Sequence, residues 1–393
     1  MNWWIFFAGG WILTICWLVA GFAPILFYRK KIIEPCTRTL PDPKHWPMIS
    51  VVVAARDESR LLEKSLRSLT AMDYPSFEVI AVNDRSADAT GEIMDRLAKG
   101  ASRIRAIHIS ELPKGWLGKC HALHCGAQRA AGEILLFTDA DVIFAPETFR
   151  LAVRYFQAHG LDHLVLFPGF SRRGYWEDAL KAYFAVSFAL WTRTWAVSSR
   201  SKNIYVGVGA FNLVRRSAYD GIGGHESLRM EILDDIALGK RLKQYGFRQD
   251  ALLAPRHLEL TWLEGVKGFV EGLEKNAFAG LQFSMANLLL VTALIVLFIA
   301  APYLGIFVFR DARIGGYITA VIAMHAAYGW QALGHRDGWR VAPALPVVAC
   351  IFLWTLWRSA LVTLRQGGIR WRDTFYSLSD LKHRSIQQTK TTK

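Results

Sequence analysis

The stretch that decides the fold is Ile49-Ser50-Val51-Val52-Val53-Ala54-Ala55, which is followed at once by Arg56-Asp57-Glu58. A run of β-branched and small apolar residues with little polar alternation is typical of a strand that is buried on both faces of a parallel sheet. The three polar residues mark the carboxyl end of that strand. In open α/β sheets ligands bind beyond the carboxyl ends of the strands, so this end is the first place to look for a site.

Strands and helices alternate along the next eighty or so residues. We expect strands at 77–82, 104–109 and 134–137, and helices at 58–72, 89–97 and 121–131. This alternation predicts an α/β fold, with a mainly parallel sheet covered by helices on both faces. Neither G-x-G-x-x-G nor G-x-x-x-x-G-K-[ST] follows any of these strands, so the sequence supports neither a dinucleotide fingerprint nor a phosphate loop.

Acidic residues follow two of the later strands. Asp84 comes after the second strand, and Asp139-Ala140-Asp141 comes after the fourth. Carboxylates are hard ligands that suit Mg²⁺ or Mn²⁺, and a pair of them leaves places for water and phosphate oxygens around the metal. The pattern therefore predicts a site for a metal and a diphosphate. The alternative is that these residues only cap helices, although Asp88 is the better cap for the helix at 89–97.

A second acidic pair, Asp234-Asp235, precedes a helix expected at 237–244. A carboxylate placed near a hydroxyl nucleophile can act as a general base. The alternative is a favourable helix start, because acidic residues in the first turn interact well with the helix dipole. On local grounds both interpretations stay open.

The composition is both apolar and basic. Hydrophobic residues make up 52% of the 393 residues, and the formal net charge is +14. So much apolar material excludes a disordered chain, and five cysteines, of which Cys16 and Cys350 lie inside apolar runs, exclude a disulfide scaffold. Nucleic-acid binding would explain the charge but not the apolar content. A membrane protein with basic cytoplasmic flanks explains both.

The apolar residues are concentrated in four runs, at 3–27, 285–309, 315–333 and 341–364. The longer runs suffice to cross a hydrocarbon core of about 30 Å. The basic triplet Arg29-Lys30-Lys31 should stay cytoplasmic and leave the N-terminus outside, and the lack of a basic start argues against the alternative of a cleaved signal peptide. We expect an N-terminal anchor at 1–28, a cytoplasmic catalytic domain at 29–284, a transmembrane bundle at 285–364 and a basic tail at 365–393, in a protein of the inner or plasma membrane.

The tail conflicts with a simple count of spans. Four spans would place it outside, yet it carries seven Lys and Arg against two Asp, and such a segment resists translocation. We expect that one segment does not span, and 315–333, which holds His325 and Gln331, is the weakest; four spans with an exposed tail is the alternative. The aromatic segment 176–195 and the segment 262–280 suit interfacial helices, with ordinary core helices as the alternative.

Together these motifs resemble the inverting family-2 glycosyltransferases with the GT-A fold, over roughly residues 48–280. The resemblance rests on residues 51–58, 83–90, 118–119, 138–142 and 234–238, which follow the family's order. It implies that Asp235, with Asp234 beside it, is the base that deprotonates the acceptor, and that Asp139 and Asp141 bind Mg²⁺ or Mn²⁺. It also implies a nucleotide-sugar site formed by Ala55, Arg56, Glu58, Asp84, Lys119 and Asp139. Asp57 and Asp234 stand where the family commonly has Asn and Glu, and both changes are mild.

A closer resemblance is to the membrane-bound branch that glycosylates carotenoid acids and hopanoid-type lipids. It rests on residues 118–123, the turn Gly223-Gly224-His225, Lys275-Asn276 and the tail segment 371–379. It implies a lipid acceptor and an acceptor or sugar pocket that includes His225, Trp371 and Tyr376. The glycine-rich stretch 207–212 adds Gly209 and Ala210, where the backbone could approach a sugar, with an ordinary glycine-rich turn as the alternative. Where those relatives have a W-K-G-R-x-Y-like motif, this chain has Trp371-Arg372-Asp373-Thr374-Phe375-Tyr376, which leaves the role of the tail open.

The resulting hypothesis is an inverting enzyme that moves one sugar from a nucleotide sugar to a lipid at the membrane. Among nucleotide sugars we favour a UDP-sugar as the donor, and we expect no nucleic-acid partner. A processive polysaccharide synthase is the first alternative, although no Q-x-x-R-W precedes the C-terminal runs. A non-catalytic membrane scaffold is the second. Cys120, His121, His124 and Cys125 suggest zinc, but the two cysteines would lie on different faces of one helix.

Overall fold

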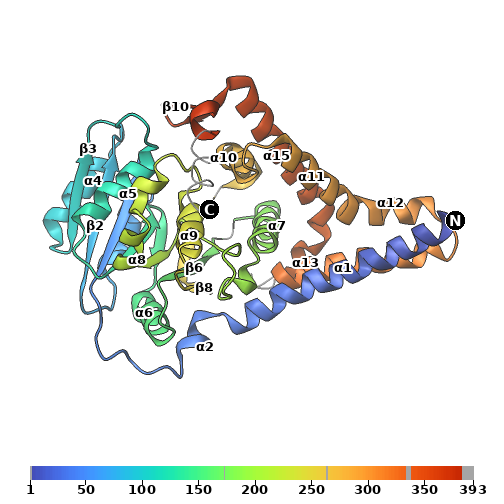
Figure 1. Cartoon of the computed structure of the whole chain (residues 1–393), viewed down its shortest axis with the longest axis horizontal. Helices are drawn as coiled ribbons and strands as arrows, with labels where there is room; N and C mark the ends of the chain where they lie inside the picture. The colour runs from blue at the N-terminus through green and yellow to red at the C-terminus, as the bar shows by residue number, and fades with distance from the viewer. Residues whose placement is uncertain (1, 172, 263, 333–337, 383–393) are drawn as a thin grey trace. The chain divides into compact units, whose positions relative to one another are not determined.

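The computed structural model describes residues 2–171, 173–262, 264–332 and 338–382. The chain divides into two compact units, each of which is described here by itself. The α/β unit comprises Lys30–Ser171 and Ala196–Trp262. The helical unit comprises Met1–Arg29, Arg172–Trp195 and Leu263–Gln387. Figure 1 shows the elements of both in colours that follow the chain.

The α/β unit is built on one eight-stranded sheet with the order β3-β2-β1-β4-β7-β6-β8-β5. The strands are β1 Ile49–Ala55, β2 Phe77–Asp84, β3 Ile104–Ile109, β4 Ile134–Asp139, β5 Val142–Phe144, β6 His163–Phe170, β7 Asn212–Arg215 and β8 Gln249–Leu260. Strands β3, β2, β1 and β4 are parallel, whereas β7 pairs antiparallel with both β4 and β6. The predicted α/β fold with a mainly parallel sheet is confirmed.

The register of the parallel strands brings their carboxyl ends to one edge. Ala55 of β1 pairs with Asn83 of β2, and Ala54 pairs with Asp139 of β4. The polar residues that follow these three strands therefore start from the same edge of the sheet. Strands β2 and β4 each run two residues further than the apolar pattern predicts, because Asn83, Asp84 and Asp139 still form ladder pairs.

Helices cover both faces of this sheet. They are α2 Ile33–Thr37, α3 Leu62–Thr70, α4 Thr90–Gly100, α5 Gly118–Arg129, α6 Thr148–Ala158, α8 Arg216–Gly221, α9 Asp234–Gln244 and the 3-10 turn η2 Gly224–Leu228. Successive residues of β1 serve opposite faces, as expected for a strand. Val51 and Val53 pack in the core cluster that contains Leu66 of α3, and Val52 packs with Leu123 of α5.

The helical unit consists mainly of long helices. They are α1 Asn2–Lys30, α7 Tyr175–Thr192, α10 Gly265–Gly280, α11 Met285–Ile295, α12 Ala301–Val308, α13 Arg313–Ala332, α14 Gly338–Val341 and α15 Leu345–Gln366, with the short turns η1 Thr194–Ala196, η3 Val296–Ala300 and η4 Ala342–Ala344. Three of the described stretches, Trp3–Gly21, Met285–Val308 and Gly338–Gln366, are long and apolar enough to cross a membrane. The antiparallel hairpin of β9 Gly368–Trp371 and β10 Thr374–Ser377 follows α15 and was not predicted.

Candidate active site

The loops after β1 and β2 are joined by hydrogen bonds at the edge of the sheet. The Asp57 backbone N–H donates to Ser86 Oγ at 3.0 Å, and the Asp57 carboxylate accepts from the Ala87 N–H at 2.8 Å. The Glu58 N–H donates to Thr90 Oγ1 at 2.8 Å. Asp57 has a φ of 54°, in the left-handed region that non-glycine residues rarely adopt. These bonds fix the backbone next to Ala55, Arg56 and Glu58, and the Asp57 side chain is used to hold the loop.

Asp88 takes the capping role that the sequence suggested for it. Its carboxylate accepts hydrogen bonds from the Thr90 N–H at 3.0 Å, at the start of α4, and from the Ser59 N–H at 3.1 Å. Burial opposes the charged form, but the hydrogen bonds from Thr90 and Ser59 outweigh it and lower the pKa of Asp88 to about 2. Asp88 rather than Asp84 therefore caps the start of α4.

Asp84 lies buried at the end of β2, with 4% of its surface exposed. Arg85 Nε donates to one carboxylate oxygen at 2.8 Å, and Arg85 has a φ of 57°. A side chain at Gly118, the first residue of α5, would overlap Asp84 Oδ2. The glycine therefore lets the start of α5 approach the Asp84 carboxylate, and the next residue of α5 is Lys119.

Lys119 joins the ends of two elements that are far apart in sequence. Its Nζ lies 2.8 Å from Asp139 Oδ1 at the end of β4 and 3.4 Å from Asp234 Oδ1 at the start of α9. Burial by itself would lower the pKa of the ammonium, but Asp139, Asp234 and Asp235 raise it well above its usual value. Lys119 is thus a cation held between the two acidic clusters that the sequence predicted.

The Asp139 and Asp141 carboxylates fit a divalent metal. Burial raises the pKa of Asp141 to about 7, with smaller contributions from the nearby charges of Asp139 and Glu58, and a bound cation would favour the ionised form. Among the described residues no group of three or more His, Cys, Asp and Glu side chains is arranged to hold a metal. Two carboxylates, with water and phosphate oxygens, are nevertheless a common donor set for Mg²⁺.

Asp234 and Asp235 form the first turn of α9, three residues before the predicted start. Asp234 is buried, with 5% of its surface exposed, and burial raises the pKa values of both carboxyls, that of Asp235 to about 7 with a contribution from Asp234. A side chain at Gly207 would overlap the Asp235 carbonyl oxygen, so the loop before β7 packs directly on this turn. The pair therefore forms a helix start, which was the alternative interpretation, and its contact with Lys119 also makes it part of the candidate site.

The predicted pocket residues lie in different places. Gly209 adjoins Asp139: its carbonyl accepts from the Asp139 N–H at 3.0 Å, and a side chain there would overlap the Asp139 carboxylate. The Ala210 carbonyl accepts from Thr138 Oγ1 at 2.8 Å. Trp371 and Tyr376 belong to the β9–β10 hairpin of the helical unit, where Lys275 Nζ lies 4.1 Å from the Trp371 ring centroid. Their contact with a substrate stays a prediction.

His225 is buried, with 1% of its surface exposed, and its ring centroid lies 4.6 Å from that of Phe137. The Tyr219 hydroxyl accepts from the His225 backbone N–H at 3.0 Å and is also hydrogen-bonded to the ring nitrogen Nδ1 at 2.9 Å. Burial lowers the pKa of His225 to about 3, which keeps the imidazole neutral. His225 therefore packs against Phe137 of β4, two residues before Asp139, and its contact with a sugar stays a prediction.

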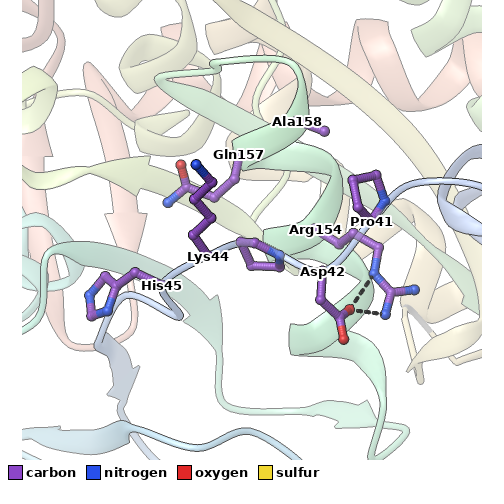
Figure 2. Close-up of a pocket in the computed structure, with 8 residues that line it drawn as sticks. Pro41, Asp42, Lys44, His45, Arg154, Gln157 and Ala158 are labelled. Atoms are coloured by element: carbon purple, nitrogen blue, oxygen red, sulfur yellow. Dashed lines mark hydrogen bonds and ion pairs between the residues drawn. The ribbon is translucent and has the colours of Figure 1, made fainter.

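Two other features do not contribute to this site. Cys120 is buried and lies 3.4 Å from the Glu231 carbonyl, whereas Cys125 lies 3.5 Å from His121 on the same helix, so the described residues give zinc no cluster. Figure 2 shows a surface hollow that is lined by residues 41–45 together with Arg154, Gln157 and Ala158 of α6. Arg154 is paired there with Asp42, and none of the predicted site residues lines the hollow.

Two curated relatives are similar to this chain in sequence. A 4,4'-diaponeurosporenoate glycosyltransferase of Staphylococcus haemolyticus is 25% identical over 256 residues, which is 63% of this chain and 65% of that relative's length. The enzyme of the same name from Staphylococcus aureus is 21% identical over 84% of this chain and 88% of its own.

Among solved structures, a mannosyltransferase of Pyrobaculum calidifontis, in complex with GDP-Man and Mn²⁺, is similar with a TM-score of 0.50 and 20% identity, over 91% of this chain and 99% of its own; that likeness shows the fold. Residues 50–223, which contain β1, β2, β4, Lys119, Asp139 and Asp141, match the family model described as glycosyl transferase family 2. The α/β unit of this chain is therefore similar to glycosyl transferase family 2 over most of its length.

Proposed function

We propose that the chain is a membrane-bound, metal-dependent inverting glycosyltransferase that moves one sugar from a nucleotide sugar to a lipid. The observation that carries this proposal is the Lys119 bridge, which brings the Asp139 cluster and the Asp234-Asp235 pair into one site. Such a site can hold a diphosphate leaving group and an acceptor base close to each other. The two staphylococcal relatives, which by name act on a carotenoid acid, support a lipid acceptor.

The donor half of the site is the edge formed by β1, β2 and β4. We assign the nucleotide to Ala55, Arg56, Glu58 and the buried Asp84 carboxylate, which can accept hydrogen bonds from a base or a ribose. Asp139 and Asp141 would hold Mg²⁺ or Mn²⁺. When bound, the metal supplies Lewis-acid stabilisation of the leaving diphosphate. The Lys119 ammonium lies at Asp139 and supplies a further positive charge at the same place.

The acceptor half of the site is the first turn of α9. In the transfer, the acceptor oxygen forms a bond to the anomeric carbon, while the bond from that carbon to the diphosphate oxygen breaks. The Asp235 carboxylate takes the proton of an acceptor hydroxyl. A base with a pKa of about 7 is well matched to that step near neutral pH, and attack opposite the leaving group inverts the configuration.

The nature of the acceptor decides how much the base matters. A hydroxyl must lose a proton as it attacks, whereas a carboxylic acid with an ordinary pKa near 4 is already ionised at neutral pH. An enzyme for a lipid hydroxyl therefore needs Asp235, and an enzyme for a lipid acid needs it much less. The size of the defect in an Asp235 variant consequently reports the acceptor class.

The test is to incubate the purified full chain with a panel of nucleotide sugars, Mn²⁺ or Mg²⁺, and lipid extract, and to identify products by mass spectrometry. We expect one added sugar per lipid, and a ladder of many sugars would contradict single transfer. With a hydroxyl acceptor, Asp235→Asn should lower kcat by about 100-fold or more while it keeps donor binding. The matched control is Asp220→Asn, an exposed aspartate on α8. Donor binding by neither variant nor wild type would support the scaffold alternative.

A further inference from the structure

Helices α1 and α13 lie side by side and run in the same direction (Figure 1). At one end, Trp3 Nε1 donates to Asp311 Oδ2, just before α13, at 3.3 Å. At the other end, Gln331 Nε2 lies 3.5 Å from the Ala20 carbonyl. Between them the helices touch through small residues, since a side chain at Gly10 would meet the backbone of Gly316. Close contact through small residues is typical of helix pairs in membranes.

Helices α11 and α12 run antiparallel to this pair. The Phe309 and Tyr317 rings stack with centroids 5.4 Å apart, and further along Tyr303 Oη is hydrogen-bonded to His325 Nε2. Trp17 Nε1 of α1 donates to the Phe298 carbonyl at 2.8 Å. That carbonyl lies four residues before Pro302, which has no N–H to offer it. The bond from Trp17 therefore satisfies a backbone acceptor in the π turn, as an apolar surrounding requires.

The polar residues of α13 do not argue against a place in the membrane. His325 is bonded to Tyr303 through one ring nitrogen and to the Ala342 carbonyl at 2.8 Å through the other. The small and polar residues of α13 are mainly on its buried face, so they are shielded by neighbouring helices, whereas Ile322 is 63% exposed. Its 20 residues are about 30 Å long, the thickness of a hydrocarbon core.

Helix α15 connects two places that belong to the same end of this bundle. It begins next to the last turns of α13, because Ala342 of the preceding turn η4 is bonded to His325 and a side chain at Gly329 would meet Trp339 and Ala342. Its later part lies beside the end of α10 and the first turns of α11. There Ser359 Oγ accepts from the Phe278 N–H at 3.0 Å, and Trp357 Nε1 donates to Thr292 Oγ1 at 3.1 Å.

In Figure 1, α15 runs crosswise between α13 and α11 rather than alongside either helix. The last turns of α1 and α13 and the first turn of α11 mark one end of the bundle. This is the end where the chain leaves α1 for the α/β unit, at Lys30, and returns to the helices through α10. If α1 and α11–α12 cross the bilayer, α15 both starts and finishes within the leaflet on that side.

We propose that α13 crosses the membrane beside α1, and that α15 does not cross but lies slanted in the leaflet on the side of the α/β unit, with lipid as the partner of its exposed face. That face is an apolar stripe with seven-residue spacing: Val347, Trp354 and Leu361 are 46%, 58% and 41% exposed. Val348, Thr355 and Ser359, on the other side of α15, are buried. An exposed apolar stripe that includes a tryptophan suits contact with lipid.

This arrangement accounts for the basic tail. Crossings by α1, α11–α12 and α13 leave the chain on the side of the α/β unit, and α15 keeps it there. The hairpin that follows, with Trp371 against Lys275 of α10, and the remaining Lys and Arg residues then need no translocation. By length and composition Gly338–Gln366 is a candidate span and α13 is not, which agrees with the expectation that 315–333 does not span. The proposal departs from that expectation because of the contacts that α13 and α15 make within the helical unit.

Single cysteines in the full chain test the proposal, in a background where the five native cysteines are replaced by alanine. The exposed positions are Arg310→Cys, Arg340→Cys and Ser379→Cys, which lie before α13, before α15 and after β10. A membrane-impermeant maleimide should label residue 310 in intact cells, and residues 340 and 379 only after permeabilisation. Labelling of residue 340 in intact cells would overturn the proposal, because it would make α15 a span.

Spin labels on the stripe give a second, independent test, provided that the background still binds nucleotide sugar. At Val347→Cys, Trp354→Cys and Leu361→Cys, immersion depth is read from the relative accessibility to oxygen and to a nickel chelate. We expect depth to fall steadily from residue 347 to residue 361. A spanning helix would place residue 354 deepest and residues 347 and 361 near opposite surfaces, since 14 residues rise about 21 Å, and that profile would refute the proposal.

Discussion

Lys119 Nζ lies 2.8 Å from Asp139 Oδ1, and this ion pair joins the start of α5 to the end of β4. The contact depends on Gly118, which lets α5 approach the sheet edge, and on Gly209, which leaves space for the Asp139 carboxylate. Asp234 is the second carboxylate within reach of the same ammonium, at 3.4 Å. The candidate site therefore depends on one cation held between acidic residues and on two glycines, and each can be tested by removing a charge or by filling the space next to a glycine.

Lys119→Met should lower nucleotide-sugar affinity by at least about tenfold and destabilise the α/β unit by about 1–2 kcal/mol. The substitution leaves Asp139 and Asp234 without their cation, and removal of one partner from a largely buried pair costs more than the pair contributed; the estimate is kept low because the Lys119 side chain is 24% exposed. Calorimetry of donor binding and urea unfolding in detergent measure the two effects. Lys114→Met, at an exposed position just before α5, should change neither.

Asp139→Ala and treatment of the wild type with EDTA should have the same effect on donor binding. Both remove the link between the diphosphate and the carboxylates that we assign to the metal. We expect Mn²⁺ to restore binding to the chelated wild type but not to Asp139→Ala, as measured by calorimetry with a nucleotide sugar. Undiminished binding after complete chelation would show that the site works without a divalent metal.

Gly209→Ala should reduce donor affinity more than it reduces stability. The new Cβ would overlap the Asp139 carboxylate, and the carboxylate would have to leave Lys119 to avoid it. Gly100→Ala is the matched control, because nothing lies within 4 Å of a Cβ built there. Equal donor affinity in Gly209→Ala and the wild type would mean that the position of Asp139 does not matter for binding.

His163 should make the stability of the α/β unit depend on pH. It is fully buried on β6, where Gln249 Nε2 donates to its Nδ1 and its Nε2 lies 3.1 Å from Asn212 Oδ1, and burial lowers its pKa to about 4. Between pH 6.5 and 4 the unfolded chain binds a proton that the folded chain does not, so stability falls as pH falls through this window. The full effect is about 3 kcal/mol, and it is constant above pH 6.5.

Urea unfolding of the full chain in detergent at several pH values measures this dependence. Other groups titrate in the same window, so the informative quantity is the difference between the wild type and His163→Gln, which cannot take up the proton. That difference should change by about 3 kcal/mol between pH 7 and pH 4. Parallel pH profiles for the two proteins would show that His163 does not titrate as its burial implies.

The strand at Ile49–Ala55 could be predicted to the residue because a buried parallel strand is an uninterrupted apolar run. The apolar pattern predicts β2 and β4 two residues too short, because the last residues of both strands are polar and lie at the candidate site. Strand β7 pairs antiparallel with β4, although it begins 73 residues after β4 ends. No local sequence pattern predicts a partner so far along the chain. The need for glycine at positions 118 and 207 likewise follows from the groups packed against them, which the sequence does not show.

The sequence by itself determined the alternation of strands and helices, the acidic residues at the strand ends and the segments apolar enough for a membrane, because each of these is a property of neighbouring residues. The tertiary structure alone reveals that Lys119 joins Asp139 to Asp234, 95 residues further along the chain, and that α13 packs along α1 while α15 connects the last turns of α13 to the first turns of α11. The physical reason is that ion pairs and helix packing depend on distances in space, which apolar periodicity and charge along the chain do not encode.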